Sequence, residues 1–190
     1  MKGTAADILV KYLEQEGVEY LFGIPGSHLL PLYDAVQRSG VIKPILAKHE
    51  AGAAFMACGY ALASGKVGVC CGTVGPGAMN LITGVASAYT DSIPLIVLTA
   101  QVGSTTFGKG ALQEGSGVGR TVHHVGLFER ITKLSTLEIH GEGIPFAIKR
   151  ALRVALSGRK GPVHIDLPAD AQAAKIEADI EPVTSYRARK

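Results

Sequence analysis

Three short segments of the sequence carry groups that could do chemistry, and each follows an apolar run that we expect to form a strand. They are Pro25-Gly26-Ser27, His49-Glu50 and the glycine-containing segment Gly75-Pro76-Gly77-Ala78-Met79-Asn80. In a parallel α/β sheet, ligands gather beyond the carboxyl ends of the strands. If the three runs are parallel strands, these segments line one edge of the sheet, and we expect any ligand site to lie there.

Each segment also has a structural interpretation. Glycines at a strand-to-helix turn expose backbone N–H groups to an anion, so the Gly75 segment could cradle a phosphate. It matches neither G-x-G-x-x-G nor G-x-x-x-x-G-K-[ST], and its spacing alone favours a tight turn without a ligand. Glu50 opens a helix, where an acid ordinarily complements the helix dipole. His28 and His49, taken singly, are more typical of hydrogen-bonded structural histidines than of catalysts.

Composition narrows the class of protein. The chain has 190 residues, of which 47% are apolar and 18% charged, which fits one folded domain. The net charge is +3 and no basic block precedes the last few residues, so charge gives no case for nucleic-acid binding. No apolar window fits a membrane span, and the first residues lack the apolar core of a signal peptide. Cys70 and Cys71 lie in an apolar run and no Cys/His pair has zinc-like spacing, so we expect free thiols, no metal ligands and a cytoplasmic protein.

Strand-like and helix-like segments alternate along the chain. Continuous apolar runs predict strands at residues 20–24, 41–46, 67–73, 94–100, 131–134 and 163–167, and apolar stripes at helical spacing predict helices at residues 5–13, 29–36, 51–62, 79–89 and 144–155. Ser27 is expected to cap the second helix. Because buried parallel strands have continuous apolar runs, the pattern predicts an α/β fold: a three-layer α/β/α sandwich with a mostly parallel central sheet.

Two stretches lie outside this alternation. Residues 103–119 are rich in Gly, Ser and Thr, which is typical of a functional loop. After residue 168 the chain loses strong periodicity and ends in a basic cluster. We therefore expect one domain at residues 1–168 and a linker at residues 169–190 that leads toward a missing central domain.

Several segments, taken in order, resemble a known family. They are Phe22-Gly23-Ile24-Pro25-Gly26-Ser27, His49-Glu50-Ala51-Gly52-Ala53-Ala54, Gly59-Tyr60-Ala61, Gly75-Pro76-Gly77-Ala78-Met79-Asn80 and Ala88-Tyr89-Thr90-Asp91-Ser92-Ile93-Pro94. Their order and spacing are similar to the N-terminal domain of the acetolactate synthase/pyruvate oxidase/benzoylformate decarboxylase family of thiamine-diphosphate enzymes. Leu112-Gln113-Glu114 and Ser157-Gly158-Arg159-Lys160-Gly161-Pro162-Val163 also resemble acetolactate synthases. The likeness covers about residues 3–168.

The resemblance implies that this pyrimidine-binding (Pyr) domain holds the aminopyrimidine ring of thiamine diphosphate. The family's glutamate falls on Glu50, whose carboxyl would sit in a dry pocket and donate a hydrogen bond to ring nitrogen N1′. That bond activates the cofactor for decarboxylation or carboligation of a 2-oxo acid. A second catalytic residue, Gln113, falls where acetolactate synthases keep an active-site glutamine. The implied pocket residues are Pro25, Gly26, Thr73, Pro76, Gly77 and Asn80, and the implied substrate contacts are Ser27, His28 and Lys133.

The sequence departs from the synthase pattern at several positions. Ser27-His28 stands where acetolactate synthases carry Gly-Ala, and a serine after Pro-Gly is more like benzoylformate decarboxylases. Met79 replaces a threonine, and Ser116-Gly117 replaces an Asp-Ile pair. These differences argue against branched-chain amino-acid synthesis as the physiological role.

The Gly-Asp-Gly motif through which the family holds Mg²⁺ and the cofactor's diphosphate does not occur in this sequence. The resemblance places that motif in a C-terminal domain of the same family, so we expect this chain to supply half of the site and to be inactive alone. A homodimer or higher oligomer is implied, and FAD use is open for a full-length protein. Three alternatives stay open: a subunit of a split 2-oxo acid decarboxylase, a nucleotide-binding α/β module and a non-catalytic interaction domain.

Overall fold

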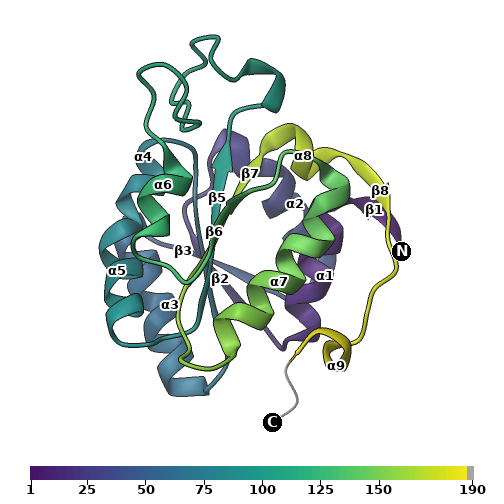
Figure 1. Ribbon diagram of the computed structural model, residues 1–190. Helices are drawn as coiled ribbons and strands as arrows, with labels where there is room; N and C mark the ends of the chain where they lie inside the picture. The colour runs from purple at the N-terminus through teal and green to yellow at the C-terminus, as the bar shows by residue number, and fades with distance from the viewer. Residues whose placement is uncertain (188–190) are drawn as a thin grey trace.

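The structure is a computed structural model that describes residues 1–187, so the last three residues of the expected linker, 188–190, lie outside it. Its centre is a six-stranded parallel sheet with the strand order β3-β2-β4-β5-β7-β6 (Figure 1). The strands are β2 (Tyr20–Gly23), β3 (Lys43–Leu46), β4 (Gly68–Gly72), β5 (Leu95–Gln101), β6 (Ser135–Leu137) and β7 (Val163–Pro168). β4 and β5, in which Cys70 is paired with Val97, are buried along their whole length. That burial explains their continuous apolar runs.

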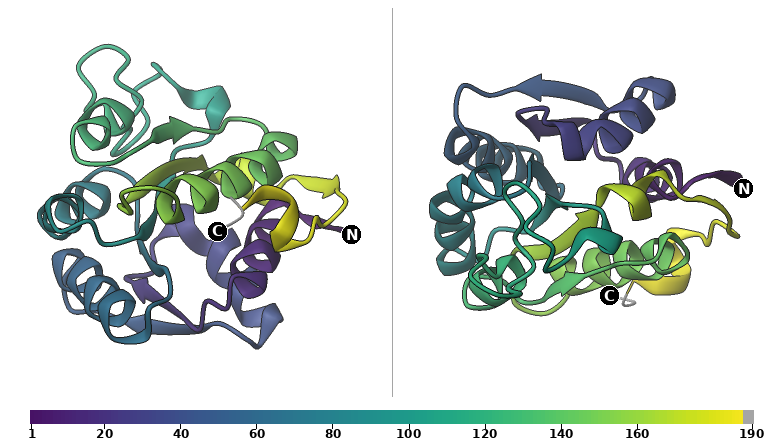
Figure 2. Two further views of the ribbon diagram at one scale, coloured as in Figure 1. Left: turned by 60° about the horizontal axis from the view of Figure 1, so that its bottom comes forward. Right: turned by 90° about the horizontal axis from the view of Figure 1, so that it is seen from above.

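Helices cover both faces of the sheet, as the views in Figures 1 and 2 show. One face carries α1 (Ala5–Gln15), α2 (Leu30–Ser39) and α7 (Ile144–Leu156), and the other carries α3 (Glu50–Ser64), α4 (Pro76–Asn80), α5 (Ile82–Thr90) and α6 (His124–Glu129). A buried apolar cluster fills the space between the sheet and each helical layer. The prediction of a three-layer α/β/α sandwich is therefore confirmed. No helix in the described part of the chain has the length and apolar character needed to cross a membrane.

The chain leaves β2 and β4 toward opposite faces. After β2 it enters α2 and returns in β3, whereas after β4 it enters α4 and α5 on the other face and continues to β5. The carboxyl ends of β2 and β4 therefore border a point where the strand order reverses, and ligands of open α/β sheets bind at such points. The long segment between β5 and α6, which contains η2 (Ser104–Thr106), rises from the same edge at the top of Figure 1.

The predicted cap of the second helix is wrong. Ser27 lies in a 3-10 helix, η1 (Ser27–Leu29), and makes no capping hydrogen bond, while α2 begins only at Leu30. Its hydroxyl lies 3.1 Å from His28 Nδ1 instead. A serine hydroxyl can hydrogen-bond to several nearby groups, and these compete with a backbone N–H of the first helical turn. Here the neighbouring imidazole is the partner of the Ser27 hydroxyl.

The segment after residue 119 also differs from the prediction. Residues 131–134 do not form a strand; β6 begins at Ser135 and pairs with β7. The short helix α6 is not predicted by any apolar stripe. Both elements lie at the end of the sheet. The residues of β6 are only half-buried, so this strand has no continuous apolar run that a sequence pattern could detect.

Residues 169–187, where we expect a linker, contact the rest of the domain. α8 (Ala169–Ala173) follows β7 directly, β8 (Lys175–Glu177) pairs antiparallel with β1 (Lys2–Thr4), and α9 (Val183–Tyr186) follows; η3 (Gly141–Gly143) precedes α7. Ile176 and Tyr186 are buried, and the Tyr186 ring meets Tyr12 edge-on with 5.9 Å between the ring centres. That this segment leads to a further domain stays a prediction.

Candidate functional site

Glu50 is the first residue of α3, as the sequence predicts. His49 precedes it as the N-cap, and its Nδ1 accepts a hydrogen bond from the Ala51 N–H at 3.2 Å, so this histidine starts the helix. Glu50 is buried, with 8% of its surface exposed. Asn80, at the end of α4, donates a hydrogen bond to Glu50 Oε2 at 2.9 Å. Within residues 1–187 no hydrogen bond reaches Glu50 Oε1, although a carboxylate oxygen can accept one.

Two glycines allow the loops to close around this carboxyl. A Cβ placed on Gly26 would lie 2.5 Å from Thr73 Cβ, so the loop after β2 touches the first residue after β4. A Cβ on Gly77 would lie 2.9 Å from Thr73 Cγ2 and 3.3 Å from Glu50 Oε1. Neither position has room for a side chain. The structure thus gathers Gly26, Glu50, Thr73, Gly77 and Asn80 at one edge, with Pro25 and Pro76 exposed beside the two glycines.

Gly75 and Gln113 meet at the same edge. Gly75 has φ +68° and ψ −114°, and a positive φ is one that glycine adopts without steric cost. This bend turns the chain from β4 into α4. A Cβ on Gly75 would lie 2.9 Å from Gln113 Cβ, and Gln113 itself has φ +65°, which is uncommon for a residue with a side chain. The long loop therefore brings Gln113, whose side chain is exposed, next to the loop that carries Gly77.

The sheet beside Glu50 presents groups that stay neutral. Cys71 in β4 is fully buried, and its Sγ lies 3.4 Å from the hydroxyl of Tyr33 in α2. Burial raises the pKa of Cys71 to about 12. Burial also raises the pKa of Tyr33 above its ordinary value. Cys58, Cys70 and Cys71 are all free and buried, which confirms the expectation of packed thiols.

Ser27 and His28 lie just beyond β2 at the same edge. Ser27 is exposed and His28 is half-buried. The His28 carbonyl accepts a hydrogen bond from Gln172 Nε2 at 2.9 Å, which ties the turn to α8. Within the described residues neither side chain makes a hydrogen bond to Glu50 or Asn80. They border the Glu50 site without contacting its carboxyl.

Lys133 does not lie with the residues around Glu50 at the carboxyl edge of the sheet. Its backbone N–H donates to the Pro162 carbonyl just before β7, at the amino ends of the strands, which is the opposite edge of the sheet. Its Nζ donates to the carbonyls of Val154 and Ser157 at the end of α7. Partial burial lowers the pKa of Lys133 from its ordinary value. Within this domain the lysine satisfies terminal helix carbonyls.

A buried polar cluster was missed by the sequence analysis. Thr99 and Gln101 on β5, His124 on α6, and His164 and Asp166 on β7 are each at most 1% exposed, and we call these five residues the Asp166 network. Within each strand the polar residues are two apart and therefore share one face. That alternation inside otherwise apolar runs is the sequence signal that could have revealed them.

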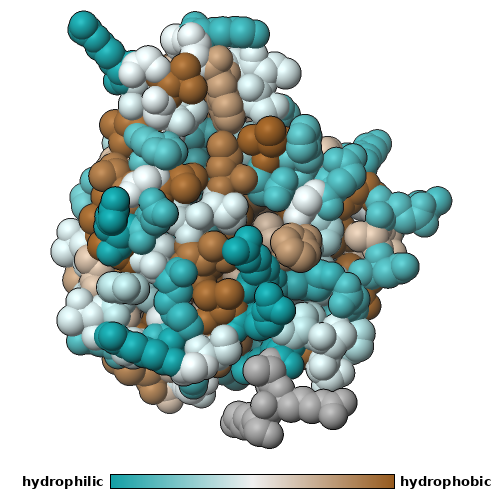
Figure 3. All heavy atoms as spheres, viewed as in Figure 1, coloured by the Kyte–Doolittle hydropathy of each residue, from teal (hydrophilic) through white to brown (hydrophobic). Residues whose placement is uncertain are grey.

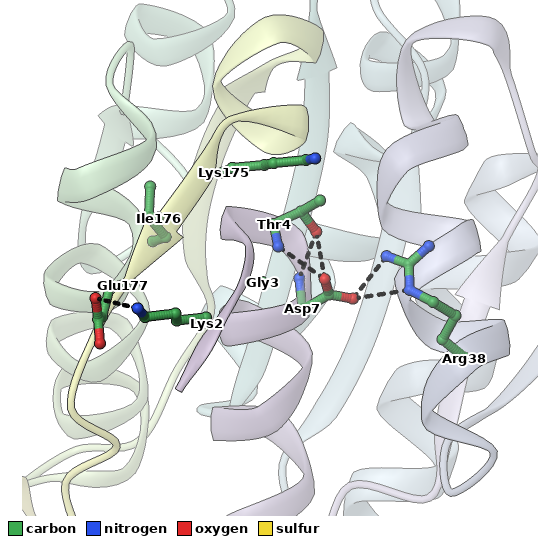
Figure 4. Close-up of a pocket in the computed structure, with 8 residues that line it drawn as sticks. All are labelled: Lys2, Gly3, Thr4, Asp7, Arg38, Lys175, Ile176 and Glu177. Carbon is green, nitrogen blue, oxygen red and sulfur yellow. Dashed lines mark hydrogen bonds and ion pairs between the residues drawn. The ribbon is translucent and has the colours of Figure 1, made fainter.

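A groove with a volume of about 610 Å³ lies away from Glu50, between the β1–β8 pair and the helices α1 and α2 (Figure 4). Its charged groups already pair with one another, for example Arg38 Nη2 with Asp7 Oδ1 at 2.6 Å and Lys2 Nζ with Glu177 Oε2 at 3.3 Å. None of the predicted site residues lines it. Among residues 1–187, no three His, Cys, Asp or Glu side chains gather to hold a metal ion.

Comparison with known proteins agrees with the resemblance. The family described as "Thiamine pyrophosphate enzyme, N-terminal TPP binding domain" matches residues 3–119. The chain is 47% identical over 182 residues to the probable acetolactate synthase large subunit of Methanococcus aeolicus, covering 96% of this chain and 29% of that protein. It is 44% identical over 185 residues to the acetolactate synthase isozyme 1 large subunit of Escherichia coli K12, covering 97% of this chain and 32% of that protein. A third relative, the acetolactate synthase large subunit of Lactococcus lactis, is 44% identical over 173 residues, which cover 91% of this chain and 29% of that protein.

The chain spans about a third or less of the length of these relatives. It corresponds to one of their domains, the N-terminal TPP-binding domain. The nucleotide-binding and non-catalytic alternatives are not favoured by this match.

Proposed function

This chain belongs to the thiamine pyrophosphate enzymes, whose N-terminal TPP-binding domain it matches, and on that premise we propose that it binds and activates the aminopyrimidine ring of thiamine diphosphate through Glu50. The single observation that carries the proposal is a buried carboxyl with one oxygen engaged and the other without a partner in the described residues. We call Gly26 and Gly77 the glycine cradle; a Cβ at either glycine would collide with Thr73, so both loops close against Thr73 beside this carboxyl.

The two oxygens of Glu50 take different roles in this proposal. Asn80 donates to Oε2, so Oε2 acts as an acceptor and Asn80 sets the rotation of the carboxyl group. Oε1, beside Gly77, then carries the proton and donates it to N1′ of the ring. Burial supports this arrangement, because a low-dielectric surrounding strengthens a hydrogen bond between the carboxyl group and the ring.

When bound, thiamine diphosphate supplies a thiazolium that serves as the electron sink for cleaving the bond next to the carbonyl of a 2-oxo acid. The residues of this chain bind the pyrimidine end, with Pro25, Gly26, Thr73, Pro76 and Gly77 as walls. Gln113, Ser27 and His28 border the same edge, and we assign them to the substrate side. A substrate contact of Lys133, which lies at the opposite edge, stays a prediction.

The remaining parts of the site lie in the rest of the enzyme in this proposal. A C-terminal domain of the same family would hold Mg²⁺ and the diphosphate, and the assembled protein would act on a 2-oxo acid as a cytoplasmic lyase or transferase, with or without FAD. Support comes from the relatives, which are about three times as long as this chain. A homodimer or higher oligomer is supported by the outer face of α3, where Phe55 and Leu62 are 47% and 70% exposed. Figure 3 likewise shows hydrophobic residues reaching the surface among hydrophilic ones on the face it displays.

The test is Glu50→Gln in the full-length protein that carries this chain. The variant keeps the shape of the side chain but has no acid proton, so pyruvate consumption dependent on thiamine diphosphate should fall about 100- to 1,000-fold. Exchange of the cofactor's C2 proton for deuterium should slow in parallel, and the far-UV circular dichroism should stay unchanged.

Glu16→Gln is the matched control, since the Glu16 side chain is 1% exposed and pairs with Arg187 on the other face of the sheet. It should leave both rates within about twofold. Near wild-type turnover in Glu50→Gln would sink the proposed role.

A further inference from the structure

Asp166 gathers the donors of the buried network. Its Oδ1 accepts a hydrogen bond from the Thr99 hydroxyl at 2.6 Å, and its Oδ2 accepts one from Gln101 Nε2 at 3.0 Å. His124 Nδ1 lies 3.3 Å from both oxygens. The carboxylate is 1% exposed, so it has no solvent contact to compensate for a lost partner.

His124 connects Asp166 to the loop after β4. Its Nε2 accepts a hydrogen bond from the Gly75 N–H at 3.2 Å, so Nε2 carries no proton and the ring is neutral with its proton on Nδ1. A neutral ring with that tautomer donates to Asp166 on one side and accepts from Gly75 on the other. The backbone of Gly75 is thereby held where the chain turns into Pro76 and Gly77.

Gln101 connects Asp166 to the long loop that contains Gln113 and Gly115. While its Nε2 donates to Asp166, its Oε1 accepts from the Gly115 N–H at 3.0 Å and from the Val102 N–H at 3.0 Å. The His124 ring packs directly on Gly115, because a Cβ there would lie 2.1 Å from His124 Nε2. Gly115 is two residues after Gln113, which in turn lies against Gly75. Both loops therefore depend on the same carboxylate.

We propose that His124 and Gln101, both held by Asp166, are positioning residues that fix the Gly75 and Gln113 loops in the geometry needed to bind the pyrimidine ring. The inference rests on the proposed function for its consequence, since the two loops matter for catalysis only if they flank the cofactor. Its structural part is independent of that function: Gly75 is tied to Asp166 through one imidazole.

The experiment uses amide hydrogen exchange in the full-length protein without cofactor, read by mass spectrometry on a peptide that contains residues 73–79. His124→Asn keeps a donor near Asp166 but is too short to accept from Gly75, so exchange in this peptide should rise about tenfold, which corresponds to about 1.4 kcal/mol. His124→Gln places its amide oxygen near the position of Nε2 and should restore most of the protection. Gln101→Met should raise exchange in a peptide that contains Gly115 and leave residues 73–79 nearly unchanged.

His164→Asn is the matched control. His164 is equally buried and hydrogen-bonds to Thr99 at 2.7 Å, but it accepts no hydrogen bond from Gly75 or Gly115, whose N–H groups donate to His124 and Gln101. It should leave exchange of residues 73–79 within about twofold of the wild type. Equal rises in His124→Asn and His164→Asn would mean general loosening and would overturn the inference, as would wild-type exchange in His124→Asn.

Thiamine diphosphate titration supplies the second readout. In His124→Asn the Kd for the cofactor should rise about tenfold while kcat at saturating cofactor changes less than threefold, because the residue holds a loop and touches no reacting atom. An unchanged Kd in a variant whose loop exchanges faster would overturn the functional part of the inference. If the wild type binds no thiamine diphosphate, the proposed function fails while the exchange results still decide the structural part.

Discussion

Two carboxylates of this chain, Glu50 and Asp166, are buried in the same sandwich but differ in their surroundings. Asp166 is 1% exposed and has three side chains within hydrogen-bonding distance: Thr99, Gln101 and His124. Glu50 is 8% exposed and accepts one hydrogen bond, from Asn80, among the described residues. A carboxylate whose acceptor sites are filled by the protein stabilises the fold, whereas one with a free oxygen beside a glycine cradle is left for a ligand. The comparison therefore agrees with a structural role for Asp166 and with the ligand-binding role that we propose for Glu50.

The largest effect that the comparison predicts is on stability. Asp166→Ala leaves several buried polar groups without a partner and should lower the free energy of unfolding by about 3 kcal/mol. Glu50→Gln keeps an acceptor for Asn80 and should change it by less than about 1 kcal/mol. Urea unfolding of both variants checks the difference. Equal losses in the two variants would abolish the distinction between the carboxylates.

The glycine cradle gives the next largest effect. In Gly77→Ala the new methyl group would collide with Thr73 Cγ2 at 2.9 Å. We therefore expect the free energy of unfolding to fall by about 1–3 kcal/mol and thiamine diphosphate to bind at least tenfold more weakly. Gly59→Ala, in the middle of α3 with no atom within 4 Å of the new methyl, should instead stabilise the domain by about 0.5–1 kcal/mol. Thermal unfolding and calorimetric titration check both. A stabilised Gly77→Ala that binds the cofactor normally would show that the cradle is not closed.

The Asp166 network also predicts a pH dependence. Burial lowers the pKa of His164 well below its ordinary 6.5. Below about pH 6.5 the unfolded chain binds a proton that folded His164 does not, so stability falls as the pH falls, by up to about 1.4 kcal/mol per pH unit. His164→Asn should flatten this part of the curve of unfolding free energy against pH. If the variant loses stability as steeply as the wild type, another group is responsible.

The smallest effect concerns the three buried thiols. Burial raises the pKa of Cys58 to about 11 and that of Cys71 to about 12, and the pKa of Cys70 is also raised, so almost no thiolate exists near pH 7. A thiol reagent such as iodoacetamide should leave all three unmodified in the native protein within an hour and modify all three in denaturant. Rapid labelling of Cys71 in the native state would show that water reaches the sheet beside Glu50.

Local patterns predicted the frame of the site well. Continuous apolar runs gave β4, β5 and β7 to within about two residues, because strands that are buried on both faces exclude polar groups from the run or confine them to alternate positions. Glu50 at the start of α3 and the Gly75 loop after β4 followed from those strands. Their meeting at one edge follows from parallel topology, in which every strand ends on the same side.

Other features depend on partners distant in sequence, and no local pattern contains them. Asp166 meets His124 only because α6 covers β7, and Gln113 reaches Gly75 only through the fold of a long loop. Ser27 is a different, local case, since its hydroxyl lies beside the ring of the next residue, His28, and not at a helix N–H.

By itself the sequence determined most of the central strands and the long helices, the parallel sheet, and the three loops at its carboxyl edge, because apolar periodicity and glycine placement act over a few residues. Only the tertiary structure decided that Asn80 occupies one oxygen of Glu50, that Lys133 lies at the opposite edge, and that Asp166 holds two glycine loops. Hydrogen bonds between distant segments decide these features, and their geometry exists only once the layers have packed.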